Sequence, residues 1–355
     1  MINIKNKFSV IGVMSGTSMD GLDVACVNYY KKNTKWYFKL LKAETFIYNQ
    51  EIKKNFTQAY KKELSVSVVD KKFGYIISDF ITSFITKHDL SVDLISSHGH
   101  TIFHDPKKGN TTQIGSGSII AQRMQIPVVC NFRQQDIDLG GQGAPLVPVG
   151  DRLLFSEYDA CLNLGGIANI SYEKQSSRLA YDICPCNILL NYIVNRLGKD
   201  FDAEGKIASK GIVDDDLLET LNKFDYYHYA PPKSLSMEDV DAFFLPMLSA
   251  LSISDSDLLA TVSEHIAIQL SNVFSQLELN TILVTGGGAF NTNLIRRIKK
   301  YSNASLALPS HNIICFKEAI VFGFLGVLRI LKQNNCLASA TGAKKDHSSG
   351  DVYLV

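Results

Sequence analysis

The sequence lacks the features that mark several large classes of protein. Its 355 residues include 36 Lys and Arg against 35 Asp and Glu, so no net charge draws the chain to nucleic acid or to an anionic membrane. Low-complexity tracts are absent, and 46% apolar with 20% charged residues excludes a disordered or collagen-like chain. The longest apolar run, residues 319–331, is interrupted by Arg329 and is too short for a bilayer span. We therefore expect a globular protein that binds neither nucleic acid nor membranes.

Cysteine is also used sparingly. The 7 cysteines show no paired CxxC spacing, and most lie in apolar segments, where a free thiol behaves as a small hydrophobic group. Cys184 and Cys186 flank Pro185 and are interpreted as packing residues. The first ten residues are too short and too polar for a signal peptide. The sequence thus predicts a reduced, cytoplasmic protein.

What is present is a motif that occurs twice. Residues 8–13 and 22–29 read as two strands joined by a polar turn, and residues 160–164 and 167–172 repeat this around Gly165 and Gly166. Helices are expected after each hairpin, at 52–60, 69–84, 188–197, 258–277 and 318–332, and further strands at 93–97, 127–130, 281–285 and 352–355. We expect two similar α/β domains, 1–132 plus 316–355 and 133–315, with a ligand cleft between them.

The first turn has the composition of a phosphate-binding site. Small residues at 12–23 allow backbone N–H groups to approach a polyphosphate, and Ser15, Thr17 and Ser18 add hydroxyl donors. Asp20 and Asp23 are candidate Mg²⁺ ligands. The turn joins two strands and has no GxxxxGK[ST], so it is not a P-loop. The alternative is a plain hairpin turn, but such a turn rarely has so many hydroxyl, glycine and aspartate residues.

Three other groups carry weaker signals. Gly286, Gly287 and Gly288 lack GxGxxG spacing, which disfavours NAD and leaves a turn against a nucleotide or a plain strand-to-helix turn. His98, His100 and His104 have no further ligand cluster, so polar substrate contacts are favoured over zinc. Asp182 follows a strand-like segment; it either points into the cleft or caps the next helix, and local sequence does not separate these roles.

Long segments of the chain resemble the anhydro-N-acetylmuramic acid kinase family. They are GVMSGTSMDGLD (12–23), HGHTIFHDP (98–106), DLGGQGAPLVP (138–148), LGGIANI (164–170), GGGAFN (286–291), the segment that starts at Glu318 and the tail at 341–343. The resemblance covers nearly the whole chain. It implies the sugar kinase/Hsp70/actin fold, with two ribonuclease-H-like domains and an interdomain active-site cleft.

The resemblance also implies an activity: ATP-dependent ring opening and phosphorylation of 1,6-anhydro-N-acetylmuramic acid to N-acetylmuramic acid 6-phosphate, in peptidoglycan recycling. Asp182 would be the general base for water and would contact the sugar, as would His98, Thr101, Arg133 and Glu318. Mg²⁺ would be bound by Asp20 and Asp23. The ATP-binding residues would be Gly16, Thr17, Ser18, Met19, Asp20, Gly21, Leu22, Asp23, Gly165, Gly166, Gly286, Gly287 and Gly288.

The chain departs from the family pattern at two places. Cys184 and Cys186 stand where the family has glycines after its aspartate, so any positive φ there would be strained, and His100 stands where the family usually has Gln. Two alternatives stay open. One is a kinase of another amino sugar or hexose without ring opening, and the other is a nucleotide or sugar sensor without turnover. A homodimer is also left open.

Overall fold

The computed structural model describes residues 7–16, 19–250 and 253–355, so Thr17 and Ser18 of the expected phosphate turn lie outside it. The chain forms two compact units, which are described separately. Unit 1 is Met1–Leu154 with Phe316–Val355, and unit 2 is Phe155–Cys315. None of the helices in the described part of the chain is long and apolar enough to cross a membrane.

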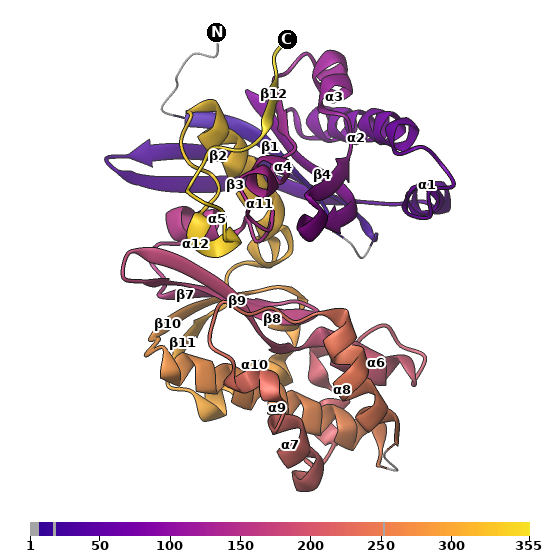
Figure 1. Ribbon diagram of the computed structural model, residues 1–355, viewed down its shortest axis with the longest axis vertical. Helices are drawn as coiled ribbons and strands as arrows, with labels where there is room; N and C mark the ends of the chain where they lie inside the picture. Colours follow the sequence, from indigo (N-terminus) through magenta and orange to yellow (C-terminus); the bar gives the residue numbers. More distant parts are fainter. Residues whose placement is uncertain (1–6, 17–18, 251–252) are drawn as a thin grey trace. The chain divides into compact units, whose positions relative to one another are not determined.

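Unit 1 is a mixed sheet with helices on both faces (Figure 1). Its strands are β1 (Lys7–Ser15), β2 (Gly21–Lys32), β3 (Lys35–Ile47), β4 (Leu94–Asp105), β5 (Asn110–Ile114), β6 (Val128–Cys130) and β12 (Asp351–Tyr353). They run in the order β12-β6-β4-β1-β2-β3, with β5 paired to β4. The helices are α1 (Gln50–Tyr60), α2 (Val66–His88), α3 (Gly117–Met124), α4 (Gln134–Asp138), α5 (Pro148–Leu154) and α12 (Ala338–Thr341).

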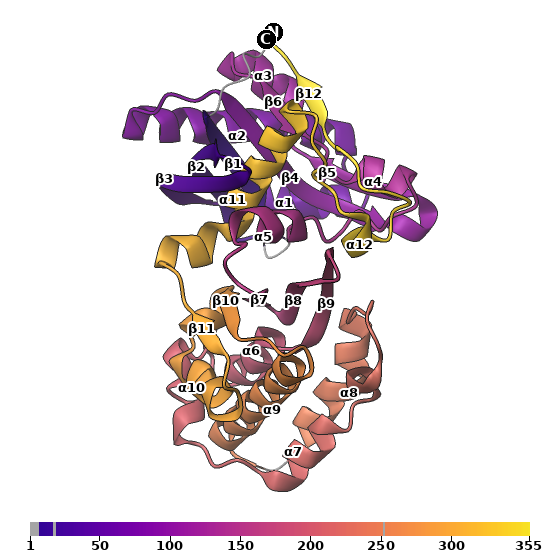
Figure 2. The same ribbon diagram turned by 90° about the vertical axis from the view of Figure 1, so that its left-hand side faces the viewer.

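The two faces of β1 pack against different helices. Ile11 and Val13 belong to one core with Phe73 and Ile77 of α2. Gly12 lies on the opposite face, where an added Cβ would stand 1.9 Å from the carbonyl oxygen of Ala319 in α11 (His311–Ile330). Only glycine allows so close an approach between strand and helix. Helix α11 therefore lies directly on the sheet, as Figure 2 shows.

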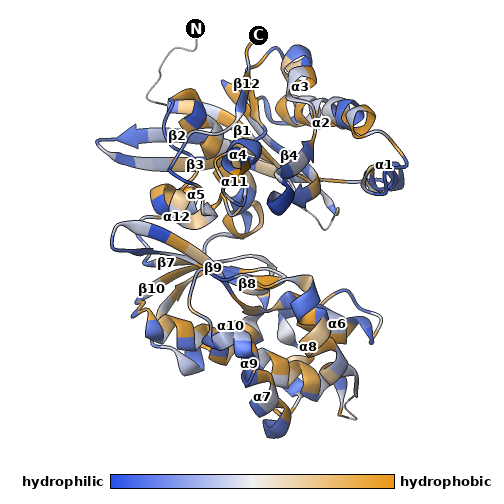
Figure 3. Ribbon diagram, viewed as in Figure 1, coloured by the Kyte–Doolittle hydropathy of each residue, from blue (hydrophilic) through white to orange (hydrophobic). Residues whose placement is uncertain are grey.

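Unit 2 has a smaller sheet built on the same plan. Its strands are β7 (Ala160–Leu164), β8 (Ile167–Lys174), β9 (Ser177–Pro185), β10 (Thr281–Thr285) and β11 (Ser305–Ala307), in the order β11-β10-β7-β8-β9. The helices are α6 (Asn187–Asn195), α7 (Asp215–Asn222), α8 (Met237–Ala250), α9 (Asp255–Gln276) and α10 (Thr292–Tyr301). Apolar and polar residues lie side by side along these helices (Figure 3), and the apolar ones form a core with the sheet.

Both units have the strand order of a ribonuclease-H-like domain. In each, three antiparallel strands form a meander, and the next strand of the main sheet pairs in parallel with the first one. A fifth strand then pairs in parallel with the fourth, as β6 does with β4 and β11 with β10. The prediction of two ribonuclease-H-like α/β units is therefore confirmed.

Three boundaries differ from the sequence expectation. Strand β4 continues through the histidine motif to Asp105. Helix α11 begins at His311 and not at residue 318. The helix runs through Lys317 because this side chain is buried in an ion pair with Asp151 (2.8 Å). The first unit extends to Leu154 and not to residue 132. Residues 133–154 stay with unit 1 because they bond and pack to it, as the Arg133–His98 hydrogen bond (2.9 Å) shows.

A buried neutral histidine makes the stability of unit 2 sensitive to acid. His265 on α9 is fully buried; it donates from Nδ1 to Asn222 Oδ1 (2.7 Å) and accepts from the Tyr227 hydroxyl at Nε2 (2.8 Å). Burial lowers its pKa to about 3. An unfolded histidine takes up a proton near pH 6.5, so the folded state loses relative stability as the pH falls below that value.

We expect His265 to remove about 1.5 kcal/mol of unfolding free energy between roughly pH 6.5 and pH 5. His265→Gln should abolish this part of the pH dependence while lowering stability at neutral pH. Urea unfolding followed by circular dichroism at several pH values measures both effects, with exposed His228→Gln as the control. An unchanged pH slope in the His265 variant would contradict the assignment.

Candidate active site

The turn between β1 and β2 is anchored through its backbone. Met19 has a positive φ of 55° and its N–H donates to the Gly16 carbonyl (3.3 Å), while the Tyr48 N–H donates to the Asp20 carbonyl (3.2 Å). A Cβ on Gly21 would stand 2.7 Å from the Phe46 carbonyl oxygen, so this position requires glycine. The Asp20 side chain is exposed. The structure therefore presents a carboxylate on a turn that the backbone holds in place.

Asp23 completes the acidic pair at the start of β2. It is half-buried and its Oδ1 accepts from the Thr45 hydroxyl (2.6 Å). Desolvation raises the pKa of Asp23, and the Thr45 hydrogen bond opposes that rise. Mg²⁺ in kinases is commonly bound by one or two carboxylates together with phosphate oxygens and water. One exposed and one fixed carboxylate on a phosphate-type turn fit that ion.

A buried hydrogen-bond chain supports the same turn. The Tyr48 hydroxyl donates to Ser15 Oγ (2.7 Å), and Ser15 Oγ lies 2.9 Å from His100 Nδ1. Burial lowers the pKa of His100 to about 4, so the ring is neutral near pH 7 and accepts the Ser15 proton. The ring also stacks on Phe56 at 4.3 Å. Tyr48 carried no sequence signal, because its role depends on strands that are distant in sequence.

Ser15 donates to the residue at position 100, where the family resemblance led us to expect glutamine instead of histidine. His100→Gln keeps a hydrogen-bond acceptor, so we expect kcat within about threefold of wild type, whereas His100→Leu leaves the buried Ser15 O–H without an acceptor, at a cost of about 1–3 kcal/mol. Steady-state kinetics and thermal unfolding of both variants test this. Equal effects of Gln and Leu would show that the acceptor does not matter.

Arg133, His98 and Glu318 form the second polar group of unit 1. Arg133 donates from Nε to His98 Nε2 (2.9 Å) and from Nη1 to the Gly143 carbonyl (2.7 Å). His98 is buried and its Nδ1 lies 3.0 Å from the Gly99 carbonyl, so the ring is neutral; desolvation, then Arg133, holds its pKa well below the usual value. Glu318 on α11 is exposed; desolvation by the protein around it raises its pKa, Arg133 opposes that rise and Asp23 adds to it.

The remaining residues of the histidine motif have local partners. Thr101 accepts from Gln113 Nε2 (3.3 Å), and exposed His104 pairs with Thr111 Oγ1 at 3.0 Å. The three histidines therefore contact different groups: His98 contacts Arg133, His100 contacts Ser15 and His104 contacts Thr111. This arrangement positions polar side chains and does not gather ligands around one point.

In unit 2 the two glycine turns lie against each other. Gly286 has a φ of 82°, and a Cβ there would stand 2.8 Å from the Leu164 carbonyl oxygen, next to Gly165. Asn187, at the start of α6, donates from Nδ2 to the same Leu164 carbonyl (2.9 Å). Gly287 is exposed and a Cβ there would meet nothing closer than 3.8 Å. The structure thus places the two glycine turns that were expected to bind ATP side by side in unit 2, with Gly287 exposed and Gly288 buried.

Asp182 lies on β9, opposite Asn169 of β8, and is half-buried. Its Oδ2 accepts from the Leu235 N–H (3.0 Å), and its backbone carbonyl accepts from the Tyr226 hydroxyl (2.6 Å). Desolvation raises the pKa of Asp182, and the Leu235 hydrogen bond opposes the rise. Because Asp182 bonds to Leu235 and not to the first turn of α6, it does not act as the cap of that helix.

The segment at 226–235, which packs beside Asp182, was not predicted from sequence to contact it. Lys233 donates from Nζ to the Tyr226 carbonyl (3.0 Å) and lies 4.5 Å from the centre of the Tyr226 ring. The only available signal was the aromatic and Lys-containing run at 226–233, which is typical of many loops. Its position beside Asp182 follows from tertiary packing.

The two cysteines that replace glycines do not strain the backbone. Cys186 has a φ of −128°, and Cys184 is not among the described residues with positive φ. Both side chains are fully buried in the core of unit 2. Strain was expected only if φ were positive at these positions; the backbone there needs no left-handed residue, and the core has room for the two thiols.

Known proteins resemble the chain along its full length. The family model for anhydro-N-acetylmuramic acid kinase matches residues 8–355. An anhydro-N-acetylmuramic acid kinase from Caldanaerobacter subterraneus subsp. tengcongensis is 31% identical, over 100% of this chain and 99% of the relative. Proteins of the same name from Crocosphaera subtropica and Clostridioides difficile are each 33% identical, covering 97% and 96% of this chain and 98% and 97% of their own.

Proposed function

The chain belongs to the anhydro-N-acetylmuramic acid kinase family, and from that premise we propose that it converts 1,6-anhydro-N-acetylmuramic acid, ATP and water into N-acetylmuramic acid 6-phosphate and ADP. The oxygen of water bonds to C1, the bond from C1 to the bridging oxygen breaks, and O6 accepts the γ-phosphoryl group. A product of this kind would serve the recycling of cell-wall sugars.

The observation that carries the proposal is the setting of Asp182. A general base works best when its pKa lies closer to the working pH than that of an exposed carboxylate. Desolvation raises the pKa of Asp182 from its ordinary value of 3.8, while the Leu235 N–H fixes one of its oxygens. The carboxylate is thus held in one orientation as it takes a proton from water.

The phosphate turn supplies the other half of the reaction. Phosphoryl transfer depends on positioning and on neutralising charge at the phosphates. We assign the ATP phosphates to Gly16–Asp23 and the adenosine to Gly286–Gly288, with Gly165 and Gly166 as further ATP-binding residues. Asp20 and Asp23 would hold Mg²⁺, which offsets phosphate charge when bound. His98, Thr101, Arg133 and Glu318 are assigned to the sugar.

A substrate comparison tests the proposal against the kinase that acts without ring opening. We expect ADP release with the anhydro-sugar and ATP, but little with N-acetylmuramic acid or N-acetylglucosamine under the same conditions. Phosphorylation of the open sugars at comparable kcat/KM would favour the alternative kinase. Nucleotide binding without ADP release on any of the three sugars would favour a sensor.

A further inference from the structure

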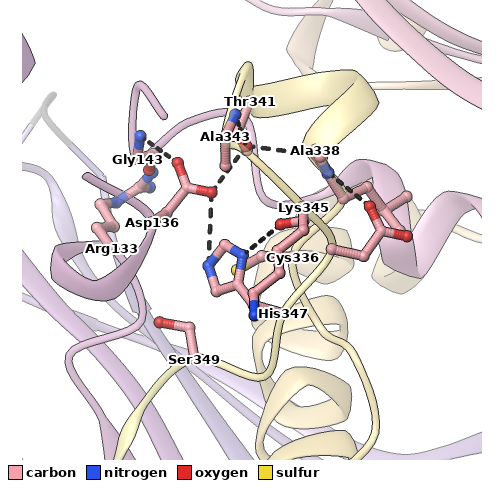
Figure 4. Close-up of polar contacts among 12 residues, drawn as sticks. Arg133, Asp136, Gly143, Cys336, Ala338, Thr341, Ala343, Lys345, His347 and Ser349 are labelled. Atoms are coloured by element: carbon pink, nitrogen blue, oxygen red, sulfur yellow. Dashed lines mark hydrogen bonds and ion pairs between the residues drawn. The ribbon is translucent and has the colours of Figure 1, made fainter. Parts of the chain in front are cut away.

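A cluster of three ligand-type side chains lies in unit 1, apart from the residues assigned above. Asp136 comes from α4, while Cys336 and His347 come from the C-terminal segment (Figure 4). Their ligand atoms all lie within 4.8 Å of one another, and the three residues are 0%, 1% and 5% exposed. They form a group of carboxylate oxygen, thiol sulfur and imidazole nitrogen that is closed off from solvent.

The histidine of this cluster faces the Asp136 carboxylate through its second ring nitrogen. His347 Nδ1 lies 3.1 Å from the Lys345 carbonyl, so Nδ1 carries the hydrogen and donates it. Nε2 has no hydrogen-bond partner and stands 3.5 Å from Asp136 Oδ1, as Figure 4 shows. A ring N–H donated to a backbone carbonyl is the usual way in which proteins orient a metal-binding histidine.

The carboxylate and the thiol are held just as firmly. Asp136 Oδ1 accepts from the Thr341 hydroxyl and Oδ2 accepts from the Gly143 N–H, both at 2.7 Å. Cys336 and His347 form an isolated antiparallel bridge, which places their side chains next to each other.

We propose that Asp136, Cys336 and His347 bind one Zn²⁺ ion in unit 1, with a single water molecule, carried in with the ion, in the fourth position. The donor set of one N, one S and one O suits zinc and does not suit Mg²⁺ or Ca²⁺. Bonds of about 2.0–2.3 Å would put tetrahedral ligands roughly 3.5 Å apart, so small side-chain rotations close the site. Binding releases the thiol proton.

The site would fasten the C-terminal segment to the loop that positions Arg133. Asp136 contacts Gly143 through its side chain, and Arg133 donates to the carbonyl of the same glycine (2.7 Å). The rival arrangement is a buried His347–Asp136 ion pair beside a neutral thiol. That pair would bind no metal, so the two arrangements differ in a direct measurement.

The test uses the full-length protein, stripped of metal with a chelator and dialysed. We expect one equivalent of Co²⁺ to give tetrahedral d–d absorption and a thiolate-to-cobalt charge-transfer band, and one equivalent of Zn²⁺ to abolish both. A Mg²⁺-type site at Asp20 and Asp23 has no sulfur and cannot give the charge-transfer band. Absence of that band in folded wild-type protein would overturn the proposal.

Variants assign the ligands. Cys336→Ala should lose the charge-transfer band, and His347→Gln should weaken zinc binding at least tenfold in competition with a chromophoric chelator. Cys26→Ala, at another buried cysteine of unit 1, should behave as wild type. If Cys336→Ala fails to fold, His347→Gln alone decides the matter, because the polar amide fills a similar volume. Unaltered zinc affinity in folded His347→Gln would refute the site.

Discussion

Replacing Asp182 with Asn is expected to lower kcat by about 10²–10⁴-fold, the usual contribution of a general base. Asn keeps the shape of the side chain, and its amide oxygen can still accept from the Leu235 N–H, so the fold and the KM values should change little. Steady-state kinetics with the anhydro-sugar give both parameters. Asp241→Asn, at an exposed carboxylate of α8 in the same unit, is the matched control and should retain full activity.

The ionisation of Asp182 also determines how kcat/KM decreases at acid pH. A base acts when it is ionised, so kcat/KM should rise with pH through the pKa of Asp182, which burial raises above 3.8. If Asp182→Asn keeps more than a tenth of the wild-type kcat, or if the substitution raises only KM, the base lies elsewhere. Glu318, whose pKa is also raised by desolvation, is then the next candidate.

Asp20→Ala should reduce Mg·ATP turnover by at least about 30-fold, because a metal-mediated contact to phosphate is worth several kcal/mol. The turn is anchored through the Asp20 backbone carbonyl and the exposed side chain can be removed without a packing loss, so the fold should persist. Initial rates across a Mg²⁺ titration measure the effect. Wild-type rates at limiting Mg²⁺ would contradict the assignment, and Asp79→Ala, at a surface ion pair, is the control.

The sequence predicted the parts of the fold that local signals determine. Alternating apolar strands around glycine turns identified both hairpins. The start of α11 was missed because a Lys-Glu pair reads as a solvent-exposed boundary. Lys317 is instead paired with Asp151, which lies far away in sequence.

Some residues of the candidate site could be predicted from sequence motifs, and others could not. Asp20, Asp23 and the glycine turns stand in motifs that can be read along the chain. Tyr48 and Leu235, which hold Ser15 and Asp182, come from segments with no motif, and only tertiary packing brings them there. Whether cysteine is strained at 184 and 186 could not be decided from the sequence, because backbone φ at a substituted glycine depends on the strand that surrounds it.

The account depends most on water attack at C1, and one measurement isolates that step. The protein is incubated with 1,6-anhydro-N-acetylmuramic acid and ATP in ¹⁸O-water, and the sugar phosphate is analysed by fragment mass spectrometry at early times, before exchange at the anomeric carbon. Ring opening by water predicts one ¹⁸O at C1 and none in the phosphoryl group. A phosphorylated sugar without solvent oxygen at C1 would contradict the hydrolytic mechanism and the role of Asp182.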